Sequence, residues 1–393
     1  MNKNISKILI GAIAMVLLVG VIISAAVQDK KLVYAQTITL PQHLALPPTK
    51  VLPAPPENLR GHLRKPPISP AANLLLVENH VAVAEHLEDV IFNTQFLTIP
   101  TYEGSGQMVH PHVLFFFEGF LGYRYIMAMT PYPFSNNAHE NPSILGSQCG
   151  IIWEVPDGAV NPVVGVPPDV RYGGYHSDPF LIRSGDVLEL WFRRTLARDE
   201  EGRRPRGNNH NRVYRTVTTD LVNWSEPEIM LDCPNNTNSF MSKVVMGDGD
   251  THRMWYANFS ASLFYIETDD LINWTERIKV TASLDGLGVW HHEINYSGQR
   301  YEALFTGVDW GNWPLFRLFY ATSYCGLDFG VGREIDVQGI SPELANMSVH
   351  KVSFVLIDGV YQMYFTVFTP SEFWRLFYFE IAEENLYKLF IPN

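Results

Sequence analysis

The stretch "TTDLVNWSEP" at residues 218–227 occurs a second time, with small changes, as "TDDLINWTER" at residues 268–277. Trp224 of the first copy and Trp274 of the second are 50 positions apart. A repeat of this length indicates an architecture built from copies of one supersecondary unit. Asp and Asn favour turns, so we expect each copy to join two strands. We expect its tryptophan, like Trp153, to pack in the core between units rather than to bind substrate.

The sequence on both sides of the repeat extends this pattern to five units. After residue 105 the chain consists of short runs rich in β-branched and aromatic residues, separated by turn residues and interrupted by no convincing amphipathic helix. Each unit divides into four runs, from "HPHVLFFF" at 110–117 in the first unit to "LYKLFIPN" at 386–393 in the fifth. Four strands per unit are typical of a propeller blade. The sequence therefore predicts an all-β fold, a five-bladed β-propeller of four-stranded antiparallel blades over residues 105–393.

The chain before the predicted propeller has three parts of different composition. Residues 1–35 combine two early lysines with an apolar run at 8–27, which is typical of a signal peptide or a membrane anchor. Residues 36–72 are Pro-rich and predict an extended linker. Residues 73–104 are expected to be an N-terminal extension that packs on the propeller. We therefore expect an extracellular protein, either secreted or tethered to the membrane by its N-terminal segment.

Composition and charge argue against several classes of protein. The 393 residues carry a net charge of −12 and no basic stripe, so we expect no nucleic-acid partner. The three cysteines Cys149, Cys233 and Cys325 allow at most one disulfide, and no cluster of Cys and His has the spacing of a structural zinc site. We expect a monomer that binds carbohydrate.

Polar residues open the innermost strand of each predicted blade, and in a propeller these strand starts converge on one mouth of the central channel. The set is His110, Asp178, Ser242, Glu293 and His350. Burying polar groups is costly unless they are paired or used. Two carboxylates that converge from different blades are what glycoside hydrolysis requires, because one protonates the leaving oxygen while the other activates water or attacks the sugar.

A resemblance to a known family follows from these motifs. The "SDP" at 177–179, the "WHHE" at 290–293 and the two Asp-Leu-x-Asn-Trp turns resemble the five-bladed superfold of glycoside hydrolase family 43, which families 32, 62, 68 and 130 share. The resemblance covers residues 105–393 and implies a glycoside hydrolase that acts on an extracellular polysaccharide or oligosaccharide. It implies that Asp178 matches the second-blade aspartate of the family and that Glu293 is the general acid.

The sequence departs from this family in the first blade, where His110 stands in place of the expected general-base aspartate. Two arrangements would restore the chemistry. Either Glu140, in the long first-blade loop, supplies a substitute carboxylate, or Asp178 is itself the base and His110 binds sugar hydroxyls. We favour the second, because strand positions are held more rigidly than loop positions.

The remaining candidates are expected to bind substrate. The polar candidates are His110, His176, Arg193, His292 and Lys351. Trp310 and Trp313 lie in the loop "VDWGNWP" and are expected to stack on sugar rings, as are the rim aromatics Tyr132 and Trp374. No cofactor and no metal ligand is assigned, although His110, His176 and His350 together could hold a channel ion, which is calcium in related propellers.

Two other functions are consistent with the same sequence. A catalytically inactive propeller that binds a glycan or a cell-surface partner is favoured by the missing first-blade aspartate. A phosphorylase would need cations at the mouth, and Arg193, Arg194 and Lys351 are the nearby candidates. We favour the hydrolase, and the sequence leaves its sugar and linkage open.

Overall fold

The computed structural model describes residues 90–198, 202–203, 210–233, 239–248, 251–312, 316–369 and 373–392. The predicted signal or anchor, the predicted linker and Trp313 lie outside these ranges. Within them, no helix is both long enough and apolar enough to cross a membrane. The extracellular location therefore stays a prediction.

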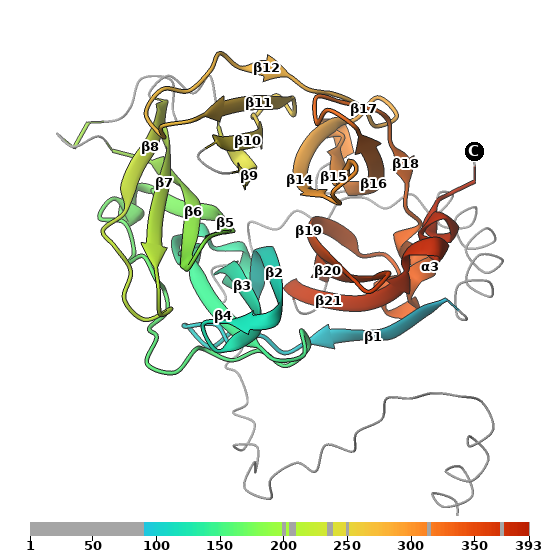
Figure 1. Cartoon of the computed structure of the whole chain (residues 1–393), viewed down its shortest axis with the longest axis horizontal. Helices are drawn as coiled ribbons and strands as arrows, with labels where there is room; N and C mark the ends of the chain where they lie inside the picture. The colour runs from blue at the N-terminus through green and yellow to red at the C-terminus, as the bar shows by residue number, and fades with distance from the viewer. Residues whose placement is uncertain are drawn as a thin grey trace, which may run out of the picture. The chain divides into compact units, whose positions relative to one another are not determined.

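The described residues form a five-bladed β-propeller, as predicted, with the blades arranged around a central axis (Figure 1). Blade one contains β2 (Met108–Phe120), β3 (Tyr123–Pro131) and β4 (Ser143–Ser147), and an isolated bridge joins Gly146 to Glu154 at its outer edge. Blade two contains β5 (Tyr175–Ser184), β6 (Val187–Leu196), β7 (His210–Thr218) and β8 (Glu228–Cys233). Blade three contains β9 (Met241–Asp248), β10 (Thr251–Ala257), β11 (Leu263–Thr268) and β12 (Ile278–Lys279).

Blade four contains β14 (Gly288–Tyr296), β15 (Tyr301–Val308), β16 (Phe316–Ser323) and β18 (Arg333–Glu334). Blade five contains β19 (Ser348–Ile357), β20 (Val360–Thr369), β21 (Phe373–Ala382) and β1 (Ile91–Leu97). A separate parallel pair joins β13 (Thr281–Ser283), which precedes blade four in the sequence, to β17 (Asp328–Val331), which lies between β16 and β18. The α-helix α3 (Val337–Ile340) is only four residues long.

The outer strand of blade five comes from the N-terminal side of the propeller. β1 pairs antiparallel with β21, and Figure 1 shows the two strands side by side. The sequence prediction that residues 386–393 form this strand was wrong, because Glu383–Leu389 is a 3₁₀ helix. Its buried residues Leu386 and Leu389 are three positions apart, which is the period of a 3₁₀ helix rather than of a strand. The pairing of β1 with β21 joins the first and last strands and closes the ring.

The repeated Asp-Leu-x-Asn-Trp segment forms the same turn in both copies. The carboxylate of Asp270 accepts hydrogen bonds from the backbone N–H groups two and three positions further on, at 2.9 and 2.7 Å. Leu271 takes the left-handed conformation, with φ of 60°. The ring of Trp274 packs edge-on against Trp191 of blade two at 6.4 Å, which confirms the structural role predicted for it. In the turn at 218–227 the carboxylate of Asp220 accepts the two equivalent bonds, also at 2.9 and 2.7 Å.

A second internal repeat, Ser-x-Cys-Gly, was missed in the sequence and lies in blades one and four. The hydroxyl of Ser147 accepts from the backbone N–H of Gly150, and that of Ser323 accepts from Gly326, both at 2.9 Å. The two glycines have φ of 77° and 73°. The cysteine of each motif carries an exposed free thiol, and Cys233 carries a buried one, so the disulfide that the sequence allowed does not form.

The hydrophobic core lies between adjacent blades rather than at the centre of the ring. Successive residues of β3 show the principle: Ile126 packs in a cluster with Leu190 of blade two, whereas Met127 packs in a cluster with Tyr364 of blade five. Neighbouring residues of a strand point to opposite faces. The middle strands are therefore buried on both sides, which explains their continuous apolar sequences.

Each innermost strand has a β-bulge or irregularity near its start. The register shifts lie between Val109 and His112, Ser177 and Phe180, Met241 and Val244, Val289 and His291, and Val349 and Lys351. In three of these bulges a non-glycine residue takes the left-handed conformation: His110, Asp178 and Ser242 have φ of 57°, 50° and 47°. This conformation is costly for residues with a Cβ atom, and bulges re-aim side chains. The bulges thus direct polar side chains into one mouth of the channel.

Candidate active site

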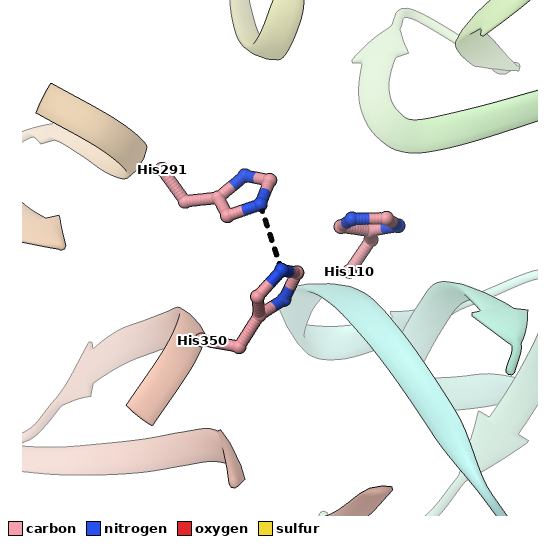
Figure 2. A group of neighbouring side chains, drawn as sticks. All are labelled: His110, His291 and His350. Atoms are coloured by element: carbon pink, nitrogen blue, oxygen red, sulfur yellow. Dashed lines mark hydrogen bonds between the residues drawn. The ribbon is translucent and has the colours of Figure 1, made fainter. Parts of the chain in front are cut away.

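Three histidines from three blades meet at this mouth of the channel (Figure 2). One ring nitrogen from each of His110, His291 and His350 lies within 4.8 Å of the others, and the Nε2 atoms of His291 and His350 are 3.2 Å apart. All three side chains are buried. Burial lowers the pKa of His110 to about 4 and holds the pKa values of the other two well below the usual range. The imidazoles are therefore neutral, which is the protonation state of a metal ligand.

The observed histidine cluster differs in one member from the group of three histidines that the sequence indicated. His110 and His350 were expected at the mouth, together with His176. The structure places His176 beside the loop of blade one, where its Nδ1 atom lies 3.2 Å from Oδ1 of Asn141. His291 takes its place in the cluster, because the bulge of blade four falls immediately before it.

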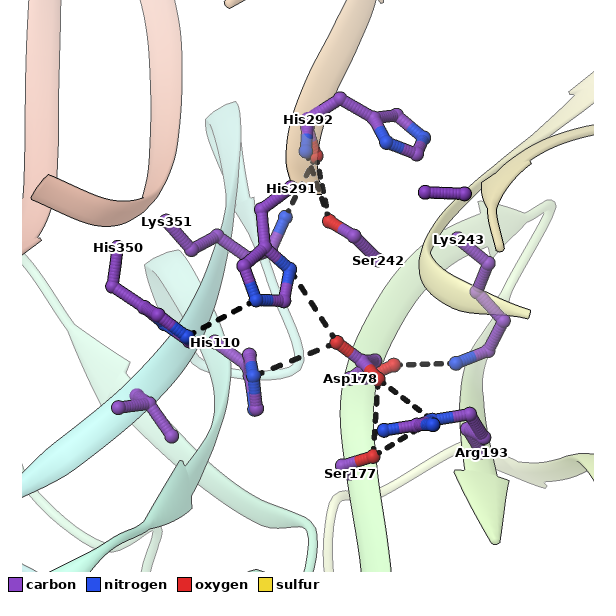
Figure 3. Close-up of polar contacts among 12 residues, drawn as sticks. His110, Ser177, Asp178, Arg193, Ser242, Lys243, His291, His292, His350 and Lys351 are labelled. Atoms are coloured by element: carbon purple, nitrogen blue, oxygen red, sulfur yellow. Dashed lines mark hydrogen bonds and ion pairs between the residues drawn. The ribbon is translucent and has the colours of Figure 1, made fainter. Parts of the chain in front are cut away.

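Asp178 links the histidines to Arg193 (Figure 3). Its Oδ1 atom lies 3.5 Å from Nε2 of His110 and 3.8 Å from Nδ1 of His291. Its Oδ2 atom accepts a hydrogen bond from Nε of Arg193 at 2.9 Å. Burial acts to raise the pKa of Asp178, but His110 and Arg193 outweigh it and hold the pKa well below the usual range. Asp178 is therefore an ionised carboxylate, at the position that the sequence predicted.

Glu140 reaches the same mouth from the loop after β3, as predicted. Its Oε2 atom lies 3.7 Å from Nδ1 of His110. Burial, and then the charge of Asp178, raise the pKa of Glu140 well above its usual value. The pKa values of the two carboxyl groups at the mouth are thus shifted in opposite directions, a division that is typical of acid–base sites.

Glu293 does not have the surroundings predicted for the general acid. Its Oε2 atom accepts a hydrogen bond from Nζ of Lys351 at 3.1 Å, and its Oε1 atom lies 3.3 Å from Nε2 of His112. His112 also lines a separate cavity of about 930 Å³, bounded by the inner strands further along the channel. Burial raises the pKa of Glu293 to about 7, against the opposing effect of Lys351. Glu293 belongs to a polar layer beneath the mouth, because the bulge of blade four places His291 where the sequence interpretation placed Glu293.

His292 and Lys351, two of the predicted substrate-binding residues, join the inner strands to one another. The carbonyl of His292 accepts a hydrogen bond from Nζ of Lys351 at 3.0 Å, and its N–H donates to Oγ of Ser242 at 3.0 Å. Lys243, which was not predicted, is also buried and donates to the carbonyl of Asp178. Burial lowers the pKa of Lys243 to about 7. Its position directly after Ser242, at a strand start, was the available sequence signal.

Arg193 contacts the site as predicted, and not all of its N–H groups are used in hydrogen bonds to described residues. It is 5% exposed, and its guanidinium packs over the ring of Tyr175 at 5.6 Å. Its Nη1 atom is buried and has no hydrogen-bond partner among the described residues. This N–H group is available to an oxygen atom of a substrate.

Aromatic rings surround the histidine cluster. Trp374 packs edge-on against His350 at 4.9 Å, so it covers a histidine rather than forming a rim platform. Trp290 packs against His291 at 5.5 Å and contacts Trp310 at 5.1 Å. Trp310 is 51% exposed, in agreement with a loop position. The sequence prediction missed Trp290, although it stands in the "WHHE" motif.

Two observations support a metal ion at the cluster of His110, His291 and His350. Oδ1 of Asp178 and the Nδ1 atoms of His291 and His350 are buried without a hydrogen-bond partner among the described residues. Buried polar groups are nearly always satisfied, so these atoms indicate a missing ligand or solvent. Three imidazole nitrogens are a donor set of divalent transition metals, whereas calcium takes oxygen ligands.

The described blades define a fold class, the five-bladed β-propellers. No protein-family model matches the chain. A curated relative, the A type blood N-acetyl-alpha-D-galactosamine deacetylase of Flavonifractor plautii, is 24% identical over 234 residues, covering 48% of this chain and 29% of that protein. The chain thus spans less than a third of that relative's length.

One solved structure superposes well enough to support the fold. The crystal structure of an N-acetylgalactosamine deacetylase from F. plautii in complex with blood group B trisaccharide superposes with a TM-score of 0.63 and 17% identity, covering 76% of this chain and 96% of that one. A GH32 beta-fructofuranosidase of Bombyx mori superposes with a TM-score of 0.49 and 14% identity, covering 78% of this chain and 66% of that one. The first superposition supports the propeller fold throughout the described blades.

Proposed function

We propose that this chain is a glycan-acting hydrolase that removes the acetyl group from an N-acetylated amino sugar, with a divalent metal ion held by His110, His291 and His350. The observation that carries the proposal is the meeting of three buried, neutral imidazoles at the channel mouth, with ring nitrogens within 4.8 Å of one another. The likeness in fold to an N-acetylgalactosamine deacetylase supports the choice of reaction.

The donor set suits the chemistry of amide hydrolysis. A metal ion with three protein ligands and an open position polarises a carbonyl group and lowers the pKa of a bound water molecule. Oδ1 of Asp178, at 3.8 Å from Nδ1 of His291, would orient that ring. The donors therefore favour zinc or a neighbouring transition metal over the calcium ion that the resemblance suggested.

The carboxyl groups at the mouth supply the proton transfers. Water adds to the carbonyl carbon of the acetamide and loses a proton to the carboxylate of Asp178, which Arg193 holds at 2.9 Å. The carbon–nitrogen bond then breaks, and the amine nitrogen takes a proton from Glu140, whose Oε2 atom lies 3.7 Å from His110. The products are acetate and a free amino sugar, and one water molecule is consumed. Nη1 of Arg193 can donate to the substrate.

Glycoside hydrolysis is the second candidate, and a specific observation favours it. The pKa of Asp178 is lowered and the pKa of Glu140 is raised in the same mouth, which is the division of roles that a glycosidase needs. In this version the acid is Glu140 rather than Glu293, because Lys351 pairs with Glu293. A glycan-binding propeller without activity is the remaining alternative.

The test measures two products from one panel of substrates. The full chain is incubated with N-acetylated amino-sugar oligosaccharides and with arabinans, xylans and fructans, and both acetate and new reducing ends are measured. We expect acetate release that is lost after chelation and restored by zinc, manganese or cobalt. His291→Gln should abolish acetate release, whereas the control His139→Gln, in the loop of Glu140 but outside the cluster, should not.

Other results would decide against the deacetylase. New reducing ends without acetate, insensitive to chelation, would identify a glycosidase. Neither product, but retention of the protein on an immobilised glycan, would identify a binding propeller.

A further inference from the structure

A second cavity, of about 520 Å³, lies beside blade two. It is bounded by the segment before β5, by the end of β6 and by the start of β7. In the paired strands, Leu196 of β6 lies opposite His210 of β7, and Tyr175 at the start of β5 lies opposite Thr195. These strand ends belong to the same end of the propeller as the histidine cluster. The charged residues that line the cavity are Asp169, Arg171, Arg194, Arg198 and Arg212.

Among the described residues, the lining of the cavity is locally cationic in an acidic protein. Four described arginines face two described carboxylates: Asp169 accepts from Nη2 of Arg194 at 3.1 Å, and Asp232 pairs with Arg212 at 3.1 Å. The chain as a whole carries a net charge of −12. Within the part of the chain that the structure describes, these two carboxylates balance only part of the positive charge of the four arginines.

The arginines are held in place by contacts that leave donors available. The guanidinium groups of Arg171 and Arg198 lie over the ring of Tyr172, at 4.6 and 4.5 Å from its centre. Tyr172 itself is 49% exposed. Nε of Arg194 is buried and has no hydrogen-bond partner among the described residues. The cavity thus presents planar guanidinium donors grouped around one aromatic ring.

One strand connects this cavity to the candidate active site. Arg193 and Arg194 are consecutive in β6, and consecutive residues of a strand point to opposite faces. Arg193 reaches Asp178 at the mouth (Figure 3), whereas Arg194 reaches Asp169 in the cavity.

We propose that the arginine cavity of blade two is a binding subsite for an anionic group, a carboxylate or a sulfate ester, on an acidic glycan. Guanidinium groups match such oxyanions in shape and can bind them through two parallel hydrogen bonds. This subsite rests on the proposed function, because it specifies that the amino-sugar glycan carries an anionic group. The chemistry proposed at the three histidines is unchanged.

Binding of defined saccharides to the full chain tests the subsite. Calorimetric titrations use oligogalacturonate as the carboxylate probe and keratan sulfate oligosaccharide as the sulfate probe, each beside its carboxyl-reduced or desulfated counterpart. Inorganic sulfate shows whether the free ion suffices. We expect at least one acidic saccharide to bind tenfold or more tightly than its neutral counterpart, with an affinity that falls as salt is added.

Variants at the exposed side of the cavity give the matched comparison. The double variant Arg171→Gln, Arg198→Gln removes two guanidiniums that make no ion pair with Asp169 or Asp232, and it should weaken acidic binding at least tenfold. The control Arg124→Gln removes an exposed arginine of β3, in blade one, and should bind as the original protein does. Equal binding by the double variant and the original protein would overturn the proposal. So would equal binding of acidic and neutral saccharides, or no binding of any acidic probe.

Acetate release from a neutral N-acetylated monosaccharide separates this proposal from the proposed function. If the original protein releases no acetate but its acidic binding depends on the arginines, the deacetylase proposal fails and the subsite stands. If acetate is released equally by both proteins and an anionic group adds no affinity, the subsite fails and the deacetylase proposal stands.

Discussion

Oδ1 of Asp178 lies 3.5 Å from Nε2 of His110, although the two residues open the innermost strands of different blades. Both residues take the left-handed conformation, with φ of 50° and 57°. Backbone strain of this kind, which costs of order 1–3 kcal/mol per residue, brings an ionised carboxylate and a neutral imidazole together at the channel mouth.

Removing the carboxylate of Asp178 should stop catalysis. Asp178→Asn keeps the shape but removes the base, so we expect kcat for acetate release to fall about 100- to 10,000-fold. The loss of charge beside the buried Arg193 should also reduce stability. Steady-state kinetics with a thermal unfolding control measure both effects, and the exposed Asp186→Asn serves as the comparison. An unchanged kcat would rule out the role proposed for Asp178.

Metal binding should stabilise the protein independently of any activity. Zinc at about 100 times its Kd should raise the free energy of unfolding by about 2.7 kcal/mol. His350→Gln removes one of the three clustered nitrogens and should abolish this gain, whereas His176→Gln, outside the cluster, should keep it. Thermal unfolding with and without zinc measures the difference. A gain of the same size in both variants would contradict the three-histidine site.

Glu293 should matter for stability more than for chemistry. Glu293→Gln leaves the ammonium group of Lys351 buried without its counter-charge, which should cost about 3–5 kcal/mol. The double variant Glu293→Leu, Lys351→Met removes both charges and should recover most of that loss. Denaturant unfolding measures the stabilities. If Glu293→Gln instead folds normally and loses only kcat, the carboxyl group is the general acid that the sequence suggested.

Glu189 should make the stability depend on pH in the acid range. Burial acts to raise its pKa, but hydrogen bonds from Arg215, His252 and Trp191 lower it from 4.5 to about 2. A folded pKa below the unfolded one stabilises the protein at pH values above 4.5, and this contribution disappears as the pH falls towards 2. It should amount to roughly 2 kcal/mol, because the partly exposed Arg215 is screened by solvent. Unfolding of the Glu189→Gln variant between pH 2 and 6 should show a reduced slope, and an unaltered slope would contradict the assignment.

Gly326 should tolerate alanine less well than another glycine of similar conformation. A Cβ atom at Gly326 would lie 2.9 Å from Cζ2 of Trp255, and φ is +73°. Gly298 has φ of +87° and nothing within 4 Å of a Cβ position, so Gly298→Ala isolates the cost of the backbone conformation, about 1 kcal/mol. Gly326→Ala should cost about 1–3 kcal/mol more, because Trp255 must move. Equal losses in the two variants would show that Trp255 adjusts freely.

The sequence by itself determined the blades and several members of the site. The repeat at Trp224 and Trp274 indicates a turn, and the continuous apolar runs indicate strands that are buried on both faces. Both patterns can be recognised within a short stretch of sequence. The same reading identified three members of the site, because each is a polar residue near a strand end or in a loop at one end of the propeller: Asp178, Glu140 and Arg193.

Only the tertiary structure decided which side chains meet. His291 rather than Glu293 reaches the mouth because the bulge of blade four falls between Val289 and His291, and a bulge depends on pairing with β15, not on the local sequence pattern. Residues 91–97 rather than 386–393 complete blade five, because an outer strand is chosen by which edge remains unpaired when the ring closes. Register and ring closure are set by contacts between residues distant in the sequence, and these decided the three-histidine cluster.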